Sequence, residues 1–405
     1  MTSLLLLILA ANPESATWPQ WRGPERDGFV SKGEAWPENL KNLKEVWRVE
    51  KLGPSYSGPI VSKDTIFTTE TRDKKTEVVT AYDRASGKPK WTQQWDGSLN
   101  VPFFAASNGS WIRSTPAFDG NSLFVAGIRD KLVCLNASNG EVRWSLDCLK
   151  EFSSAVPDFG CVCSPLVHEN AVYIQAGAGF LKLEKSTGRV LWRKLVDGGG
   201  TMGSAFSSPL LVKFGDTPTL LVQTRTKLAA VNPDTGDTLF SKEIPSFRGM
   251  NILTPTPFEN GIFTSTYGGN TQMLKVTPSA AGLSIDEGWK FKYEGNMTSP
   301  VVIDGHAYLL GKDQRFVCVD LKEGKQTWRS DKSYGKYWSL VANGDRILAL
   351  DQRGTLLLIK ANPKELDVID EKKISKDETW AHLAVAGDEI VIRDLYSLSV
   401  WKWTR

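Results

Sequence analysis

Short apolar runs alternate with turn-forming residues along most of the chain. Between Ser114 and Asp147 the runs STPAF, SLFVAG, KLVCLN and EVRWSLD are separated by DGN, by Arg129-Asp130 and by ASNG. Short runs rich in β-branched and aromatic residues, bounded by Gly, Asn or Asp, are typical of consecutive antiparallel strands joined by tight turns. This segment therefore predicts a unit of four strands.

The same unit recurs, and a Ser/Thr-Pro step marks where it starts. The helical period of 3.6 residues is not found within the units, so a helical repeat is disfavoured. Eight units with a period of about 46 residues match the length of a propeller blade. We therefore expect an all-β fold, an eight-bladed β-propeller of four-stranded antiparallel blades over residues 43–405. The predicted starts are SGP at Ser57, STP at Ser114, CSP at Cys163, SSP at Ser207, PTP at Pro255, TSP at Thr298, WSL at Trp338 and AHL at Ala381.

Most units end on a glycine turn followed by an aromatic residue, as in SGKPKW, which ends at Trp91, and NGEVRW, which ends at Trp144. Propeller blades diverge away from the central axis, so we expect each flat ring to fill the gap between neighbouring blades. The preceding glycine is expected to take the positive φ that the turn requires. The aromatic residues at this position are Trp91, Trp144, Trp192, Phe240, Trp289 and Trp328.

The last unit is short of one strand. Only AHLAVA, EIVIR and SLSVWKW follow Trp380, whereas LKEVWRVE, from Leu43 to Glu50, has no unit of its own. An unpaired strand edge is an aggregation hazard. The sequence therefore predicts that this N-terminal strand completes the eighth blade, with Trp47 in the aromatic position.

Composition and the N-terminus indicate where the protein works. The 405 residues carry a net charge of +3, with 49 basic and 46 acidic side chains, so there is no basic footprint for nucleic acid. The run LLLLILAA (Leu4–Ala11) predicts a signal peptide within residues 1–16 and is too short to span a bilayer. We expect a periplasmic or secreted monomer with no transmembrane segment, in which residues 17–42 form an N-terminal extension.

Catalytic motifs are scarce. The three histidines fall in different units and are interpreted as structural residues, and no GxSxG, Walker or HExxH motif is present. Cys134 and Cys318 occupy matching places in two units, which is typical of small buried side chains. Cys161-Val162-Cys163 could be a strained disulfide, a soft metal site or a structural pair.

The turn and aromatic pattern AYDRASGKPKW resembles the tryptophan-docking repeat of PQQ-type eight-bladed propellers. The leader WPQWRGPERDG (Trp18–Gly28) resembles the start of secreted PQQ-like propeller proteins. The resemblance implies two functional branches. Quinoprotein dehydrogenases hold PQQ with Ca²⁺, use an Asp base and carry a disulfide between adjacent cysteines. BamB-like propellers carry no cofactor and bind proteins during outer-membrane assembly.

The BamB-like branch is favoured because the chain has no Cys-Cys step and little length beyond the blades. We therefore expect a non-catalytic propeller that binds a protein or a polysaccharide of the cell envelope and holds no cofactor or metal. A PQQ-dependent dehydrogenase with calcium, or another enzyme using the central funnel, is the alternative, since fold alone does not carry function.

The binding surface is expected on the loops that return from each outer strand to the next inner strand, because these loops converge on the axis. Several are long and rich in aromatic, Met and Arg residues, which binding surfaces enrich. The alternative is that these side chains pack as a plug over the channel. Arg113 and Arg248 could form a two-arginine clamp for an anionic group. The candidate binding residues are Phe103, Phe104, Trp111, Arg113, Arg248 and Trp338.

Overall fold

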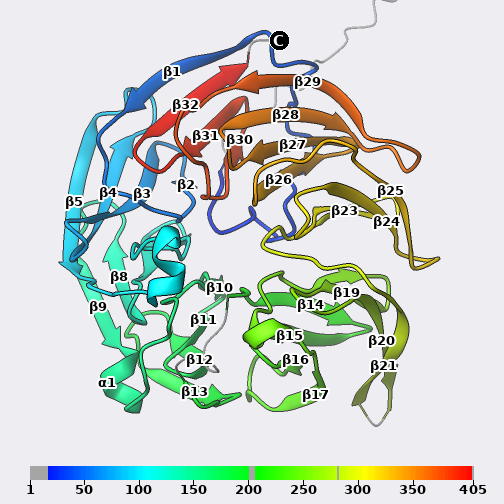
Figure 1. The fold of residues 1–405 in the computed structure, drawn as a ribbon. Coiled ribbons are helices and arrows are strands. Elements are labelled where there is room, and N and C mark those ends of the chain that lie inside the picture. The colour runs from blue at the N-terminus through cyan, green and yellow to red at the C-terminus, as the bar shows by residue number, and fades with distance from the viewer. Residues whose placement is uncertain (1–16, 200–205, 281, 404–405) are drawn as a thin grey trace, which may run out of the picture.

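The fold consists of eight four-stranded antiparallel sheets arranged in a ring (Figure 1). The computed structural model describes residues 17–199, 206–280 and 282–403, so the expected signal peptide in residues 1–16 lies outside the described residues. The predicted all-β, eight-bladed propeller is confirmed. Figure 1 also shows the segment before the first strand, in dark blue, running between the innermost strands.

In blades 1 to 7 the strands follow chain order from the axis to the rim, and three short helices lie in the connections of the described residues. Blades 1 to 4 comprise β2 (Ile60–Val61), β3 (Thr65–Arg72), β4 (Thr76–Asp83), β5 (Pro89–Asp96); β6 (Ala117–Phe118), β7 (Ser122–Ala126), β8 (Lys131–Asn136), β9 (Val142–Asp147); β10 (Leu166–His168), β11 (Ala171–Ala176), β12 (Gly179–Glu184), β13 (Val190–Lys194); β14 (Leu210–Phe214), β15 (Thr217–Gln223), β16 (Lys227–Val231) and β17 (Thr238–Glu243). Blades 5 to 7 comprise β18 (Thr256–Phe258), β19 (Gly261–Ser265), β20 (Thr271–Ser279), β21 (Gly282–Phe291); β22 (Val301–Ile303), β23 (His306–Leu310), β24 (Phe316–Asp320), β25 (Lys325–Arg329); β26 (Trp338–Asn343), β27 (Arg346–Asp351), β28 (Thr355–Lys360) and β29 (Asp367–Lys373). The helices are η2 (Phe103–Asn108), α1 (Cys148–Phe152) and η3 (Phe247–Gly249).

Blade 8 is built from both ends of the chain. It contains β30 (Ala384–Ala386), β31 (Glu389–Arg393) and β32 (Leu398–Trp403), and its outer strand is β1 (Leu43–Val49). β1 runs antiparallel to β32, which it covers at the rim (Figure 1). The predicted closure by the N-terminal strand is therefore confirmed.

Neighbouring blades are joined at the rim by tryptophan hydrogen bonds. A β-bulge lies at or just before each of these tryptophans, and bulges re-aim side chains by increasing the local twist. Each indole Nε1–H donates to a turn carbonyl of the next blade at 2.7–3.1 Å. The pairs are Trp47 with Arg84, Trp91 with Ala137, Trp144 with Lys185, Trp192 with Asp234, Trp289 with Leu321 and Trp328 with Asn362.

The turn glycine serves the neighbouring blade as well as its own turn. Gly188 has a φ of 74°, and a Cβ atom there would lie 2.5 Å from a ring atom of Trp144. Gly140 stands in the same relation to Trp91. Most of these indoles remain half-buried, so the aromatic position does more than fill a gap. It anchors one blade to the turn of the next.

A second set of bonds joins the blades near the axis and explains the Ser/Thr-Pro steps. The hydroxyl at this step accepts a hydrogen bond from the backbone N–H of the equivalent residue in the preceding blade, with N···O distances of 2.9–3.3 Å. These hydrogen bonds link, in order, Gly58, Thr115, Ser164, Ser208, Thr254 and Ser299. In blade 5 the step is Thr254-Pro255, because Thr254 carries the hydroxyl in this series. The triplet of blade 5 that is equivalent to Ser114-Thr115-Pro116 is thus Leu253-Thr254-Pro255, so the predicted start at Pro255 lies two residues too late.

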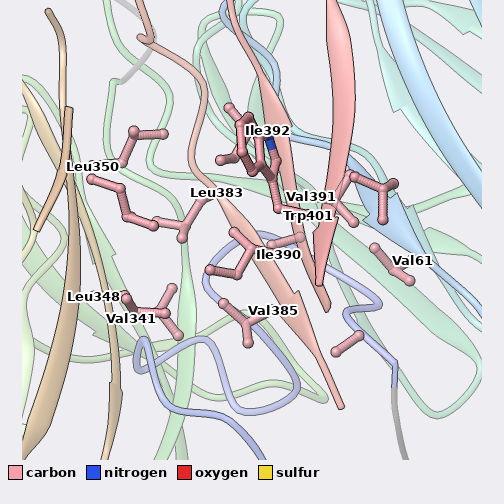
Figure 2. Packing of buried hydrophobic residues seen from close by; sticks show 14 of the residues in the cluster. Val61, Val341, Leu348, Leu350, Leu383, Val385, Ile390, Val391, Ile392 and Trp401 are labelled. Atoms are coloured by element: carbon pink, nitrogen blue, oxygen red, sulfur yellow. The ribbon is translucent and has the colours of Figure 1, made fainter. Parts of the chain in front are cut away.

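Apolar side chains fill the spaces between adjacent sheets. Figure 2 shows Leu348 and Leu350 of β27 facing the blade 8 side chains Leu383, Val385 and Ile390. All five cysteines are buried and free. Cys134 and Cys318 lie opposite Trp144 and Trp328 in their sheets, which confirms that they occupy matching places. No helix in the described ranges is long and apolar enough to cross a membrane.

Candidate functional site

The N-terminal extension occupies the centre of the ring. Trp18 exchanges two backbone hydrogen bonds with Val61 of blade 1, at 2.8 and 3.0 Å. Phe118 of blade 2 donates to Pro19 at 2.7 Å, and Ala342 of blade 7 donates to Gly28 at 2.8 Å. These partners lie on the inner strands β2, β6 and β26, so residues 17–30 fill part of the axial channel.

Two buried arginines of the extension join distant blades. Arg22 donates to the carbonyl of Pro300 in blade 6, and Arg26 donates to Pro165 in blade 3 at 2.8 Å. Both guanidinium groups lie 5.6 Å from the ring of Trp21, a distance suited to cation–π attraction. Burial lowers the pKa of each arginine to about 10, so both stay charged at neutral pH.

We call residues 17–30 the plug. A cavity of about 420 Å³ borders the plug, and Trp21 is the plug residue that lines it. Every blade contributes to the wall with the residue two positions before one equivalent position, which is Gly58 in blade 1, His382 in blade 8, and Thr115, Ser164, Ser208, Thr254, Ser299 or Ser339 in the others. We call these eight contributing residues the axial ring. They are Tyr56, Arg113, Val162, Phe206, Ile252, Met297, Tyr337 and Trp380.

Strand geometry explains which residues reach the cavity. In extended backbone, successive side chains point to opposite sides, so residues two apart share a side. Thr115, Ser164, Ser208, Ser299 and His382 accordingly also line the cavity. The residue between them faces the blade core, and Trp338 is such a residue. It is 1% exposed, and its Nε1–H donates to Asp351 at 3.0 Å. Trp338, a predicted binding residue, is thus part of the core, whereas its neighbour Tyr337 lines the cavity.

Aromatic rings cover one side of the cavity. The ring centroid of Tyr56 lies 5.2 Å from Trp380 and 5.3 Å from Trp111, and Trp380 stacks on Tyr337 at 6.1 Å with an interplanar angle of 12°. We call Tyr56, Trp380 and Tyr337, which line the cavity, the aromatic wall. The other side is apolar as well, with Phe159 against Phe206 at 5.6 Å.

The remaining predicted residues are spread over the same face. Arg113 lines the cavity, and Trp111 stands behind Tyr56 without lining it. Phe103 is 91% exposed in η2. Arg248 is exposed, with its guanidinium 5.2 Å from the ring of Phe247. Because Arg248 does not line the cavity, the structure does not bring it together with Arg113 as a clamp. The side chain of Phe104 lies outside the described part of the chain.

His382 borders both the plug and the cavity. Its ring stacks on Trp18 at 6.3 Å and meets Trp21 edge-on at the same distance, while Nδ1 lies 2.9 Å from its own neighbour's carbonyl, that of Leu383. Burial, together with the nearby positive charge of Arg22, lowers the pKa of His382 to about 3. His382 is therefore neutral at physiological pH and has the structural contacts expected of it, although its place on the cavity was not foreseen.

The donor set of the cavity does not fit PQQ with calcium. Calcium takes oxygen ligands that include carboxylates. The described residues that line the cavity include no Asp or Glu, and hence neither a carboxylate ligand nor an Asp base. Cys161 and Cys163 are separate thiols, and burial raises the pKa of the Cys163 thiol to about 12. Within the described ranges, no three His, Cys, Asp or Glu side chains are grouped to hold a metal.

Sequence reasoning missed most of the axial ring. Tyr56, Phe206, Met297 and Trp380 were not among the predicted residues. The signal was present, because all eight ring residues lie at one fixed offset from the position that six of the blades fill with Ser or Thr. The sequence prediction instead favoured large side chains in long loops, such as Phe103.

Comparisons with known proteins agree with this architecture. An outer membrane protein assembly factor BamB from Moranella endobia (strain PCIT) is 23% identical over 332 residues, covering 78% of each chain. The crystal structure of BamB from Moraxella catarrhalis matches with a TM-score of 0.61 and 14% identity, over 90% of this chain and 98% of that one.

A quinohemoprotein alcohol dehydrogenase from Comamonas testosteroni matches with a TM-score of 0.66 and 13% identity, over 96% of this chain and 81% of that one. At this identity the likeness shows the fold alone. The family model described as outer membrane protein assembly factor BamB matches residues 74–330, which is more than half of the chain. The protein therefore belongs to the BamB family of PQQ-repeat propellers.

Proposed function

We propose that the protein is a non-catalytic binding protein of the cell envelope, periplasmic or secreted and monomeric, that holds a partner protein on the face bearing the cavity. The observation that carries the proposal is the cavity of about 420 Å³, to which all eight blades contribute and whose surrounding loops expose Phe103, Val196 and Phe247. Exposed apolar side chains around a concave centre are typical of protein-binding sites. The family membership supports the same role.

A protein partner is favoured over a polysaccharide because the cavity wall is mainly apolar. Of the described residues that line the cavity, Arg113 and Lys336 carry a positive charge and none carries a negative charge. Apolar and aromatic pockets take side-chain anchors of a partner protein, and such anchors supply most of the binding energy of protein interfaces. The dehydrogenase alternative is not supported by the cavity, for the reasons of donor chemistry given above.

Photo-crosslinking in intact envelopes tests this role. A photoreactive benzoylphenylalanine replaces Val196 or Phe247 on the loop face, and Val142 or Val368 on the outer strands serves as the matched exposed control. We expect a discrete protein adduct, identified by mass spectrometry, from the loop positions only. Adducts formed only from Val142 and Val368 would place binding at the rim. Retention on a glycan array without any protein adduct would favour a polysaccharide.

A further inference from the structure

Arg113 is the one charged member of the axial ring, and its charge is incompletely satisfied. Its Nη2 donates to the carbonyls of Asn108 and Gly109, at 3.1 and 2.6 Å. Nε is buried without a hydrogen-bond partner, and Nη1 has none among the described residues. An arginine offers five N–H donors in a planar fork. The Nη1–H groups of Arg113 are therefore unused hydrogen-bond donors at the edge of the cavity.

No carboxylate in the described ranges forms an ion pair with Arg113. Its guanidinium lies 5.2 Å from the ring of Tyr56, so its closest charge-type contact is a cation–π interaction. The carboxylate of Glu378, near Tyr56, is engaged elsewhere. Its Oε2 accepts from Trp380 at 2.6 Å, and its Oε1 accepts from Gln352 at 3.1 Å. Arg113 is thus a cation at a cavity whose described wall contains no negative charge.

The residues around Arg113 indicate which chemical groups a ligand of the cavity would carry. The aromatic wall begins at Tyr56, which lies next to Arg113, and continues through Trp380 to Tyr337. Aromatic rings favour stacked or edge-to-face contacts with other rings at centroid separations of about 4.5–7 Å. A cavity of about 420 Å³ is large enough for one bulky side chain or a small molecule.

We propose that the cavity binds a carboxylate joined to an aromatic or bulky apolar group, with the carboxylate on Arg113 and the apolar group on the aromatic wall. This inference rests on the proposed function, because it names the anchor by which a partner is held. Hydrogen bonds between a guanidinium and a carboxylate are charge-assisted, and the unused Nη1–H groups of Arg113 can donate one to a carboxylate oxygen. The same chemistry is offered by the C-terminal residue of a peptide chain and by a free aromatic carboxylate.

Matched probes on the purified full chain test the carboxylate. N-acetyl-phenylalanine is compared with its amide, and an acetylated Ala-Ala-Ala-Ala-Phe peptide is compared with its C-terminal amide. Binding is followed by tryptophan fluorescence, since Trp21 and Trp380 line the cavity, and by calorimetry. We expect each acid to bind about tenfold or more tightly than its amide, which corresponds to one charge-assisted interaction. A tighter peptide identifies a chain end as the source, and a tighter small acid identifies a free carboxylate.

Variants assign the effect to the proposed residues. Arg113→Gln is expected to abolish the preference for the acid, whereas Arg129→Gln, an exposed arginine in the same blade, leaves it unchanged. Tyr337→Ala leaves the contacts of Arg113 in place, so it is expected to weaken acid and amide in equal proportion. The melting temperature of each variant verifies the fold.

Equal affinity for acid and amide, an unaltered preference in Arg113→Gln, or no binding of any probe would overturn the inference. Loop-face crosslinks that persist in any of those cases would leave the proposed protein-binding role standing. Loss of the crosslinks with an intact acid preference would instead overturn the proposed function alone.

Discussion

The indole of Trp144 in blade 2 lies against Gly188 of blade 3, and its Nε1–H donates to the carbonyl of Lys185 in the same turn at 2.9 Å. The turn can meet the ring this closely because Gly188 has no Cβ atom. The packing of blade 2 against blade 3 therefore depends on the conformation of the turn that contains Gly188.

Gly188→Ala is expected to cost more stability than an ordinary glycine substitution at positive φ. An alanine in left-handed backbone costs about 1–2 kcal/mol. At Gly188 the new methyl group would also push against Trp144. Gly344→Ala is the control, because Gly344 has a φ of 55° with open space around it. Equal losses in urea denaturation would show that the contact with Trp144 contributes little.

Truncating Trp144 separates the ring from its hydrogen bond. Trp144→Ala is expected to lower the free energy of unfolding by about 3–5 kcal/mol, the usual cost of removing a buried tryptophan. Trp144→Phe should retain most of this stability, because blade 4 uses Phe240 at the same position without an N–H donor. Trp111→Ala, in a loop, should cost far less than Trp144→Ala. The reverse order in denaturation experiments would contradict the assigned roles.

Removing the closing strand is expected to cause aggregation. Deletion of residues 1–50 exposes the edge of β32 and removes the bond from Trp47 to Arg84. Exposed strand edges pair with other chains. Deletion of residues 1–16 retains β1 and is expected to leave a soluble protein. Size-exclusion chromatography of the two truncated proteins provides the measurement, and equal solubility would contradict a closing role for β1.

His382 is expected to make stability depend on pH between 7 and 5. Its pKa is about 3 in the folded protein and about 6.5 in an unfolded chain, so the unfolded state binds more protons in this range. The contribution of His382 to the free energy of unfolding is therefore complete above pH 6.5 and is lost progressively as the pH falls below it. The contribution between pH 7 and pH 5 is about 2 kcal/mol.

Comparison with a variant isolates the histidine from other titrating groups. The stability of His382→Gln should change less between pH 7 and pH 5 than that of the original protein, whereas His168→Gln, at the exposed end of β10, serves as the control. Denaturation curves at several pH values provide the measurement. An identical pH profile in His382→Gln would show that this residue is not the source.

Much of the fold could be predicted because each blade repeats the same local chemistry. The turn before Trp91 and the strand around Trp47 carry their structural signal in a few adjacent residues. The site is harder because its members come from eight blades and meet only after the ring closes. Trp338 and Tyr337 show the difficulty. They are neighbours of similar character, and a shift of one position exchanges the core side of the chain for the cavity side.

The use of β1 as the outer strand of blade 8 has a consequence for biosynthesis. β1 precedes every other described strand in the chain, and β32, its partner, follows them all. A nascent chain therefore cannot complete its ring, however many blades have formed, until β32 has been synthesised. Ring closure is thus the last step of assembly, and a chain that stops before Leu398 has no closed form.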